Sequence, residues 1–245
     1  MSEPTTARRA LVTGGSGELG AAICDALADA GWHVIVHAHR SPERANQMVA
    51  AIHHRGAGAQ AIAFDVCDAR ASRAALDQLL VDGPIHAVIN NAGIHDDAPM
   101  AGMSGEQWHR VIDVSLHGFF NVTQPLLLPM ARARFGRIVS VSSVAAMLGN
   151  RGQTNYAAAK AALHGASKSL AREMASRGIT VNVVAPGVIQ GRMADAAFPA
   201  ERIREVVPAQ RAGTPQEVAA LVAFLCSDAA AYINGQVIGV NGGMG

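Results

Sequence analysis

Short apolar runs alternate along the chain with longer segments in which apolar residues recur every three or four positions. The short runs are rich in Val, Ile and Ala, which is typical of strands buried on both faces. The longer segments have the spacing of amphipathic helices. We expect strands at 10–13, 33–38, 59–66, 85–93, 136–143, 179–187 and 236–243, and helices at 21–31, 41–56, 71–80, 104–134, 154–178 and 214–227.

This alternation predicts an α/β fold. We expect a doubly wound, seven-stranded parallel sheet of the Rossmann type with helices on both faces. No linker-like stretch interrupts the pattern, so a single domain over 1–245 is expected. Ser41 and Pro42 are placed to cap and begin the second helix. The least regular part, at about 188–213, is expected to form a lid-like segment over a site.

Composition and charge narrow the classes of function. The chain has 245 residues, half of them hydrophobic, and a formal net charge of +1. This balance does not favour nucleic acid or an anionic membrane as the partner. The three cysteines and ten histidines lack metal-ligand spacing, so we expect reduced thiols and no metal site. The start of the chain does not resemble a signal peptide, and no apolar run approaches ~18 residues, which together favour a cytoplasmic protein.

The stretch LVTGGSGELG, residues 11–20, is the strongest local motif. It follows the first expected strand and opens the first expected helix, which is the context of a dinucleotide loop. Its glycines match G-x-G-x-x-G, and also T-G-x-x-x-G-x-G except that Glu18 replaces the middle glycine. A carboxylate is favourable in the first turn of a helix, and its side chain can point to solvent. We therefore expect the loop to hold a diphosphate despite Glu18.

The segment after the second strand bears on the choice of dinucleotide. An acid that would hold the adenosine ribose is expected there, but residues 37–41 read HAHRS. Arg40 and Ser41, helped by Ser16, suit a 2′-phosphate, which favours NADPH/NADP+ over NADH. The alternative is that Arg40 is a solvated loop residue. Asp65 is a candidate acceptor for the adenine amino group, and Asn91 follows the fourth strand at the ligand-binding edge.

The candidate catalytic group is Ser143, Tyr156 and Lys160. Tyr156 and Lys160 are four residues apart on an expected helix, so they share a face. A nearby ammonium lowers the pKa of a tyrosine, and Ser143 at the end of a strand can donate to a carbonyl oxygen. A surface Tyr–Lys pair is the alternative. The glycine loop upstream favours the catalytic interpretation.

These motifs together resemble the short-chain dehydrogenase/reductase family over essentially the whole chain, and within it the 3-oxoacyl-(acyl-carrier-protein) reductases. The resemblance rests on VTGGSGELG, NNAG, SVSS, YAAAK, SLAREMASRGITVNVVAPG and VNGGM. It implies reduction of a 3-oxoacyl thioester with Tyr156 as general acid, Lys160 on the nicotinamide ribose and Ser143 on the substrate carbonyl. HDDAPMAGM and VIDVSLHGFF further indicate the aryl polyene-type subgroup. The expected cofactor-binding residues are Gly14, Ser16, Gly17, Glu18, Leu19, Arg40, Ser41, Asp65, Val66, Asn91, Ala92, Gly93, Tyr156, Lys160, Pro186, Gly187 and Ile189.

The chain departs from the family pattern at two further positions. Ser115 stands where the family has an asparagine that holds a proton-relay water; it either keeps that role or only accommodates a helix bend. Gly191 stands where a threonine often contacts the cofactor.

The resemblance also implies partners. An acidic acyl carrier protein is expected to dock at Arg134 and Arg177, although a generic surface role for both arginines is the alternative. The expected assembly is a homotetramer with paired long helices, a dimer or a hetero-oligomer with a related subunit being the alternatives. Two other functions stay open: a reductase of free small ketones, alcohols, sugars or sterols, and a non-catalytic dinucleotide sensor.

Overall fold

One parallel sheet forms the centre of the computed structural model, which describes residues 7–191 and 199–245. Its seven strands lie in the order β3-β2-β1-β4-β5-β6-β7. All neighbouring strands are parallel, which confirms the predicted doubly wound arrangement. The strands are β1 (Arg9–Val12), β2 (His33–Ala38), β3 (Ala59–Ala63), β4 (Ala87–Asn90), β5 (Gly136–Val141), β6 (Ile179–Pro186) and β7 (Val237–Val240).

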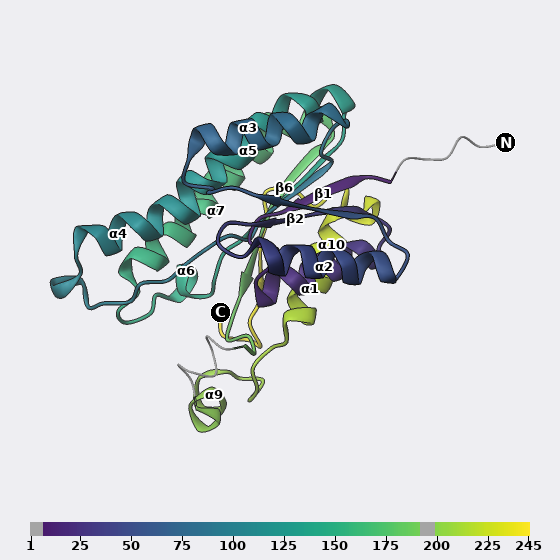
Figure 1. Ribbon diagram of the computed structural model, residues 1–245. Coiled ribbons are helices and arrows are strands. Elements are labelled where there is room, and N and C mark those ends of the chain that lie inside the picture. The colour runs from purple at the N-terminus through teal and green to yellow at the C-terminus, as the bar shows by residue number, and fades with distance from the viewer. Residues whose placement is uncertain (1–6, 192–198) are drawn as a thin grey trace.

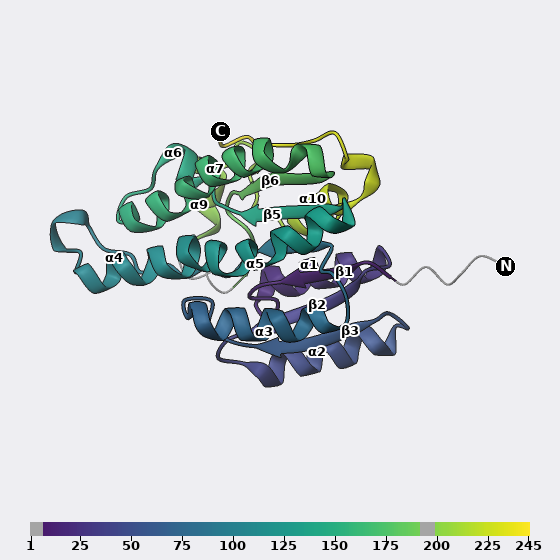
Figure 2. The same cartoon turned by 90° about the horizontal axis from the view of Figure 1, so that it is seen from above.

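Helices cover both faces of this sheet (Figures 1 and 2). One face carries α1 (Glu18–Asp29), α2 (Pro42–His54) and α10 (Pro215–Cys226), and the other carries α3 (Ala69–Val81), α5 (Gly118–Ala133) and α7 (Thr154–Met174). Successive residues of a strand point to opposite faces. Val12 accordingly packs in the core under α1 and α10, whereas Leu11 packs in the core under α3 and α5.

Smaller helices lie in the connections. They are η1 (Met100–Gly102), α4 (Gly105–Ile112), the π-helical η2 (Asp113–His117), α6 (Ala145–Leu148), η3 (Ala175–Arg177), α9 (Ala200–Val206) and η4 (Asp228–Ala230). Capping residues define several starts. Ser104 and Gln107 form a capping box at α4, and Thr214 and Glu217 form another at α10.

The long helical segment expected at 104–134 is present but is not a regular α-helix. The π turn η2 separates α4 from α5, and a π turn places an extra residue in the helix. Just after it, a Cβ on Gly118 would stand 3.0 Å from Cγ2 of Val66, so the helix lies directly against the loop after β3. The apolar spacing continues across this turn, and for that reason spacing alone does not reveal it.

Two further local expectations need correction. The strand expected at 59–66 ends at Ala63, so Asp65 and Val66 belong to the loop that follows. Ser41 is the N-cap residue of α2, but its side chain makes no capping hydrogen bond to the described first turn. Its ψ of 60° differs from the extended backbone that usually directs a capping hydroxyl at that turn. Its hydroxyl therefore does not fix the start of α2.

The expected lid-like segment is partly described. Ile189 forms a parallel bridge with Gly213, so the two ends of the segment meet near the sheet. Between them, α9 stands away from the layered body of the molecule (Figure 1). Residues 192–198 lie outside the described part of the chain.

Candidate active site

The glycine-rich turn between β1 and α1 forms a cradle at the carboxyl edge of the sheet. Gly14 has a φ of +62°, a conformation that favours glycine. A Cβ on Gly20 would overlap the carbonyl oxygen of Gly14, so the start of α1 packs directly on the loop. Gly17 is the N-cap of α1, and the first-turn N–H groups of a helix have no intrahelical acceptor. The loop therefore supplies the donors and the close approach that a diphosphate requires.

Thr13 and Asn91 hold this loop from the β4 side. Thr13 Oγ1 accepts hydrogen bonds from the backbone N–H groups of Asn91 and Ala92, both at 3.0 Å. Asn91 Nδ2 donates to the carbonyl oxygens of Thr13 at 2.9 Å and Gly14 at 3.2 Å. These bonds join the ends of β1 and β4. They place Asn91, Ala92 and Gly93 beside the cradle.

His37, a residue that the sequence did not single out, holds the same loop from the other side. Its Nδ1 accepts from the backbone N–H of Gly14 at 3.0 Å, and its Nε2 lies 3.0 Å from the carbonyl oxygen of Phe64. The side chain is buried, and burial lowers the pKa of His37 to about 4. It is therefore a neutral imidazole at neutral pH.

The residues expected around adenosine lie along the ends of β2 and β3. Arg40 is exposed just after β2. Asp65 accepts a hydrogen bond from the backbone N–H of Cys67 at 2.9 Å, and one of its oxygens lies 3.7 Å from Nε2 of His39. Val66 is buried, and its carbonyl oxygen accepts from Asn121 Nδ2 at 2.9 Å. The carboxyl ends of β2 and β3 thus offer both a cation, Arg40, and a carboxylate, Asp65.

Ser143, Tyr156 and Lys160 come together where β5 ends and α7 begins. The side chain of Ser143 is hydrogen-bonded to that of Tyr156. Lys160 Nζ lies 5.8 Å from the centroid of the Tyr156 ring and donates to the carbonyl oxygen of Val141 at 2.9 Å. A Cβ on Gly93 would stand 3.0 Å from the same ammonium. The three side chains therefore lie beside the segment that also borders the nucleotide loop.

Burial dominates the acid–base properties of this group. Burial raises the pKa of Tyr156, and the hydrogen bond from Ser143 partly opposes it. Burial lowers the pKa of Lys160 to about 8. The expected lowering of the tyrosine pKa by the ammonium is not what this geometry produces, because Nζ is directed at Val141 and the desolvation of Tyr156 is the larger effect. Tyr156 is therefore held as a protonated phenol, the form that an acid must have.

Buried polar side chains around the group were missed by sequence reasoning. Asn155 Nδ2 donates to the carbonyl oxygens of Asp96 at 2.9 Å and Gln107 at 3.1 Å, which fixes the first turn of α7 both to the loop before α4 and to the first turn of α4. Ser142 Oγ donates to the carbonyl oxygen of Lys160 at 3.1 Å and lies 2.7 Å from Nε2 of His164. None of these residues forms a local motif, because each partner is distant in sequence.

The segment after β6 closes the cradle on a second side. The carbonyl oxygen of Pro186 accepts from the N–H of Val144 at 2.7 Å, and a Cβ on Gly187 would stand 2.8 Å from the Cα of Asn241. Ile189 packs against the core under α1 and α10. A Cβ on Gly191 would overlap the Glu18 carboxylate. Two positions that depart from the family pattern, Glu18 and Gly191, are therefore in contact.

Ser115 lies in the π turn η2 and is buried. Its Oγ has no hydrogen-bond partner among the described residues. The turn contacts α7, the helix that carries Tyr156 and Lys160. A water bound to this hydroxyl would satisfy it, because a buried hydroxyl without a partner is unfavourable.

Arg134 and Arg177 are neighbours but lie far from the other candidate residues. Arg134 ends α5, and its Nη2 donates to the carbonyl oxygen of Ser176 at 3.2 Å. Arg177 follows the end of α7, whereas Tyr156 is in its first turn. At ~1.5 Å per helical residue, about 30 Å of helix separates Arg177 from Tyr156. The structure does not place these arginines at the active site of the same chain.

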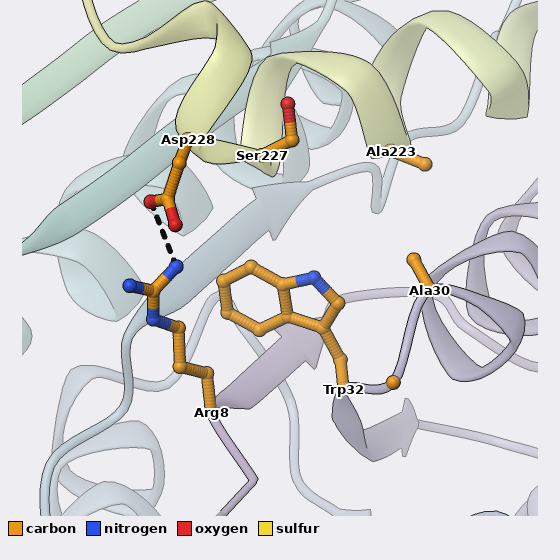
Figure 3. Close-up of a pocket in the computed structure, with 7 residues that line it drawn as sticks. Arg8, Ala30, Trp32, Ala223, Ser227 and Asp228 are labelled. Carbon is orange, nitrogen blue, oxygen red and sulfur yellow. Dashed lines mark hydrogen bonds and ion pairs between the residues drawn. The ribbon is translucent and has the colours of Figure 1, made fainter.

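A hollow of about 240 Å³ lies at the opposite edge of the sheet, lined among others by Arg8, Trp32 and Asp228 (Figure 3). It is remote from Ser143 and Tyr156, because Arg8 and Trp32 precede β1 and β2 while Ser143 follows β5. Over residues 7–191 and 199–245, no helix combines the length and apolar character that crossing a membrane requires.

Comparison with known proteins identifies the family. A family model described as enoyl-(acyl carrier protein) reductase matches residues 16–245. The chain is 42% identical over 236 residues to the 3-oxoacyl-(acyl-carrier-protein) reductase FabG of Aggregatibacter actinomycetemcomitans, covering 96% of this chain and 98% of that protein. The protein is a short-chain dehydrogenase/reductase. FabG of Escherichia coli K12 is 44% identical over 238 residues, with 96% of each chain covered.

A solved structure agrees with this assignment. The short-chain dehydrogenase/reductase fold of this chain matches a crystal structure of a candidate gluconate dehydrogenase from Agrobacterium tumefaciens with a TM-score of 0.94 and 33% identity, covering 97% of this chain and 95% of that one. The family uses a nicotinamide dinucleotide. The cradle fits such a group, because Gly14 and Gly20 let the loop close tightly against Asn91 and on itself, and the start of α1 offers donors to a diphosphate.

Proposed function

We propose that this short-chain dehydrogenase/reductase reduces a 3-oxoacyl thioester on an acyl carrier protein to the 3-hydroxyacyl form, with NADPH as reductant. The observation that carries the proposal is the joint placement of Ser143, Tyr156 and Lys160 beside the nucleotide loop. A non-catalytic dinucleotide sensor does not require these three side chains to meet. The names of the FabG relatives supply the substrate class.

The chain's own residues handle the substrate oxygen and its proton. Ser143 Oγ donates a hydrogen bond to the 3-oxo oxygen and so polarises the carbonyl. When bound, the reduced nicotinamide would supply a hydride, that is, the two electrons and the hydrogen of the new C–H bond at the 3-oxo carbon. The phenol of Tyr156 gives its proton to the same oxygen as negative charge develops there. Lys160, buried beside Tyr156, would hold the nicotinamide ribose.

NADPH is favoured by the groups at the end of β2. Arg40 is exposed just after β2, and a guanidinium pairs well with a phosphate. Ser41 and Ser16 are hydroxyl donors for the same 2′-phosphate. Asp65 would accept a hydrogen bond from the adenine amino group, and Val66 would line the site for the adenine ring.

Docking of the carrier protein is proposed at Arg134 and Arg177 of a neighbouring copy. A carrier at these arginines stands about 30 Å along α7 from Tyr156 of the same chain. In a homotetramer in which α5 and α7 pair antiparallel with those of a second copy, the arginines of one copy lie closer to Tyr156 of the other copy. Phe120 and Leu128 support such pairing, because they lie two turns apart on α5 and are 61% and 68% exposed.

The test is NADPH oxidation by the purified protein with short, long and polyenoic 3-oxoacyl carriers and with carrier-free ketones. We expect fast turnover on carriers and a collapse of kcat/KM when the carrier is removed. Arg134→Glu and Arg177→Glu should weaken the carrier reaction and leave the carrier-free reaction unchanged. Preference for free ketones, alcohols, sugars or sterols would refute the proposed substrate. Preference for polyenoic chains would support the aryl polyene-type subgroup.

A further inference from the structure

His37 connects three segments that border the nucleotide cradle. It is the fifth residue of β2, it accepts from Gly14 in the loop after β1, and it contacts the carbonyl oxygen of Phe64 after β3. The side chain is 1% exposed. Its ring packs on that of Phe64 with centroids 4.2 Å apart. One side chain therefore sets the spacing of the three strand ends.

The partners of His37 determine its protonation. The backbone N–H of Gly14 can only donate, so Nδ1 carries no proton. The carbonyl oxygen of Phe64 can only accept, so Nε2 carries the proton. After burial, the next largest effect on the pKa of His37 is the hydrogen bond to Phe64, which raises it. The titratable groups near the ring, His39 and Asp65, have smaller effects, His39 lowering this pKa and Asp65 raising it. The neutral Nε2–H form is the only one that satisfies both backbone groups.

Gly14 is held on both sides as a result. Its carbonyl oxygen accepts from Asn91 Nδ2 at 3.2 Å and from the N–H of Gly17 at 3.0 Å. Its N–H is directed away from the cradle to His37. The positive φ of Gly14 is thus supported by a partner at each end of the residue. A loop that is already ordered does not use binding free energy to become so.

We propose that His37 is a positioning residue for the dinucleotide: through Gly14 and Phe64 it holds the diphosphate loop in its binding conformation. The proposal rests on the nicotinamide dinucleotide of the family and not on the acyl substrate. The diphosphate is common to NADH and NADPH, so His37 affects both equally. Arg40, in contrast, is expected to affect NADPH alone.

The experiment measures dinucleotide binding without substrate, by fluorescence titration of NADPH and NADH. His37→Phe keeps the packing on Phe64 but loses both hydrogen bonds, and we expect the Kd for both dinucleotides to rise about tenfold. In His37→Asn the side-chain oxygen lies near the position of Nδ1 and can accept from Gly14, so its Kd should rise less. Turnover at saturating dinucleotide should stay within about twofold of wild type, because the catalytic side chains are unchanged.

His33 at the other end of β2 is the matched control. Its Nε2 also bonds across to β3, to Gln60 at 3.1 Å, but at the edge remote from the cradle. We expect His33→Phe to lower Tm and leave both Kd values unchanged. An unchanged Kd in His37→Phe, or an equal rise in His33→Phe, would show a purely structural role and overturn the proposal.

If His37→Phe does not fold, the comparison of His37→Gln with His37→Asn tests the same proposal. His37→Gln reaches Phe64 but not Gly14, so its Kd should exceed that of His37→Asn, and equal values would overturn the proposal. The test of His37 can fail or succeed independently of the test of the proposed reductase function. A wild-type protein that binds dinucleotides but reduces no 3-oxoacyl carrier would refute the substrate and leave the role of His37 intact.

Discussion

The two edges of the sheet differ in which backbone groups of the helices are left without partners: N–H donors at the carboxyl edge and carbonyl acceptors at the amino edge. In a doubly wound fold the helices direct their N-termini to the carboxyl edge of the strands and their C-termini to the amino edge. At the carboxyl edge the loop residue Gly14 is held by His37 and Asn91, and the donors of α1 face the cradle. At the amino edge, buried arginines of this chain bind carbonyl groups near helix ends and at the start of β5.

Arg9 and Arg137 begin strands at the amino edge and are both buried. Arg9 Nη1 donates to the carbonyl oxygens of Leu79 at 2.8 Å and Gly83 at 2.7 Å, at the end of α3. Arg137 Nη1 donates to Gly136 at 3.0 Å and Gly178 at 3.4 Å. These charge-assisted bonds satisfy acceptors that would otherwise need water.

An aromatic residue completes this closed edge. The guanidinium groups of Arg8 and Arg137 lie 3.9 and 4.2 Å from the centroid of the Phe135 ring. Arg8 also pairs with Asp228 at 2.8 Å beside Trp32 (Figure 3). The helix dipoles therefore have different consequences at the two edges. At the carboxyl edge the N–H donors stay available for a ligand, whereas at the amino edge the chain's own arginines bind the carbonyl groups.

The largest effect is expected from Tyr156→Phe at the carboxyl edge. Loss of the phenol removes the proposed proton donor, so kcat should fall about 100- to 10,000-fold. The Kd for NADPH should change little, since the glycine loop is untouched. Stopped-flow reduction assays and fluorescence titration check the two parts. Near-normal turnover would show that Tyr156 is not the acid.

Acid should destabilise the carboxyl edge through His37. Its pKa is lowered to about 4 in the fold, from about 6.5 in an unfolded chain. Between these two pH values the unfolded state binds more protons than the folded state. The contribution of His37 to the free energy of unfolding is therefore fully present above about pH 6.5 and is lost as the pH falls toward 4. The contribution at stake is about 3 kcal/mol. Urea unfolding between pH 7 and pH 5 should show a steeper loss for wild type than for His37→Asn, and equal slopes would contradict this.

At the amino edge, Arg137→Met should cost stability without affecting binding. The substitution leaves buried carbonyl groups without donors and removes the contact with Phe135, for a loss of about 2 kcal/mol in the free energy of unfolding. Arg8→Met is the control, because Arg8 is only half-buried. It stacks on the same ring and pairs with the exposed Asp228, so its loss should cost under about 1 kcal/mol. Equal losses, or a raised Kd for NADPH in Arg137→Met, would break the distinction between the edges.

Arg40→Asp should separate the two dinucleotides. A carboxylate in place of the guanidinium repels a 2′-phosphate and can accept from ribose hydroxyls. We expect the KM for NADPH to rise about tenfold and that for NADH to stay equal or fall. A wild-type protein with the higher kcat/KM for NADH would refute the proposed role of Arg40.

The fold could be predicted from the sequence, and the candidate catalytic group could be proposed from it, because both have local signals. Apolar runs mark the strands, and Tyr156 and Lys160 share a helix turn that any reader of the spacing can find. The residues that hold the site and the sheet edges in place could not be predicted from the sequence, because their hydrogen bonds join segments that are distant along the chain. His37 meets Phe64, Asn155 meets Asp96, and Arg137 meets Gly178 only after the strands have paired. The cofactor residues, the assembly and the cytoplasmic location stay predictions.

The smallest expected effect concerns Ser115, whose buried Oγ has no partner among the described residues. A water at this hydroxyl would connect η2 to the region of Lys160 and return protons to it. Ser115→Ala should then slow reduction a few-fold and shift its pH dependence, with an unchanged Kd for NADPH. Ser115→Asn should be tolerated, since an amide can hold the same water. The competing explanation is that Ser115 only accommodates the π turn. In that case Ser115→Ala lowers Tm while its pH profile matches wild type, and the proton must reach Tyr156 by another route.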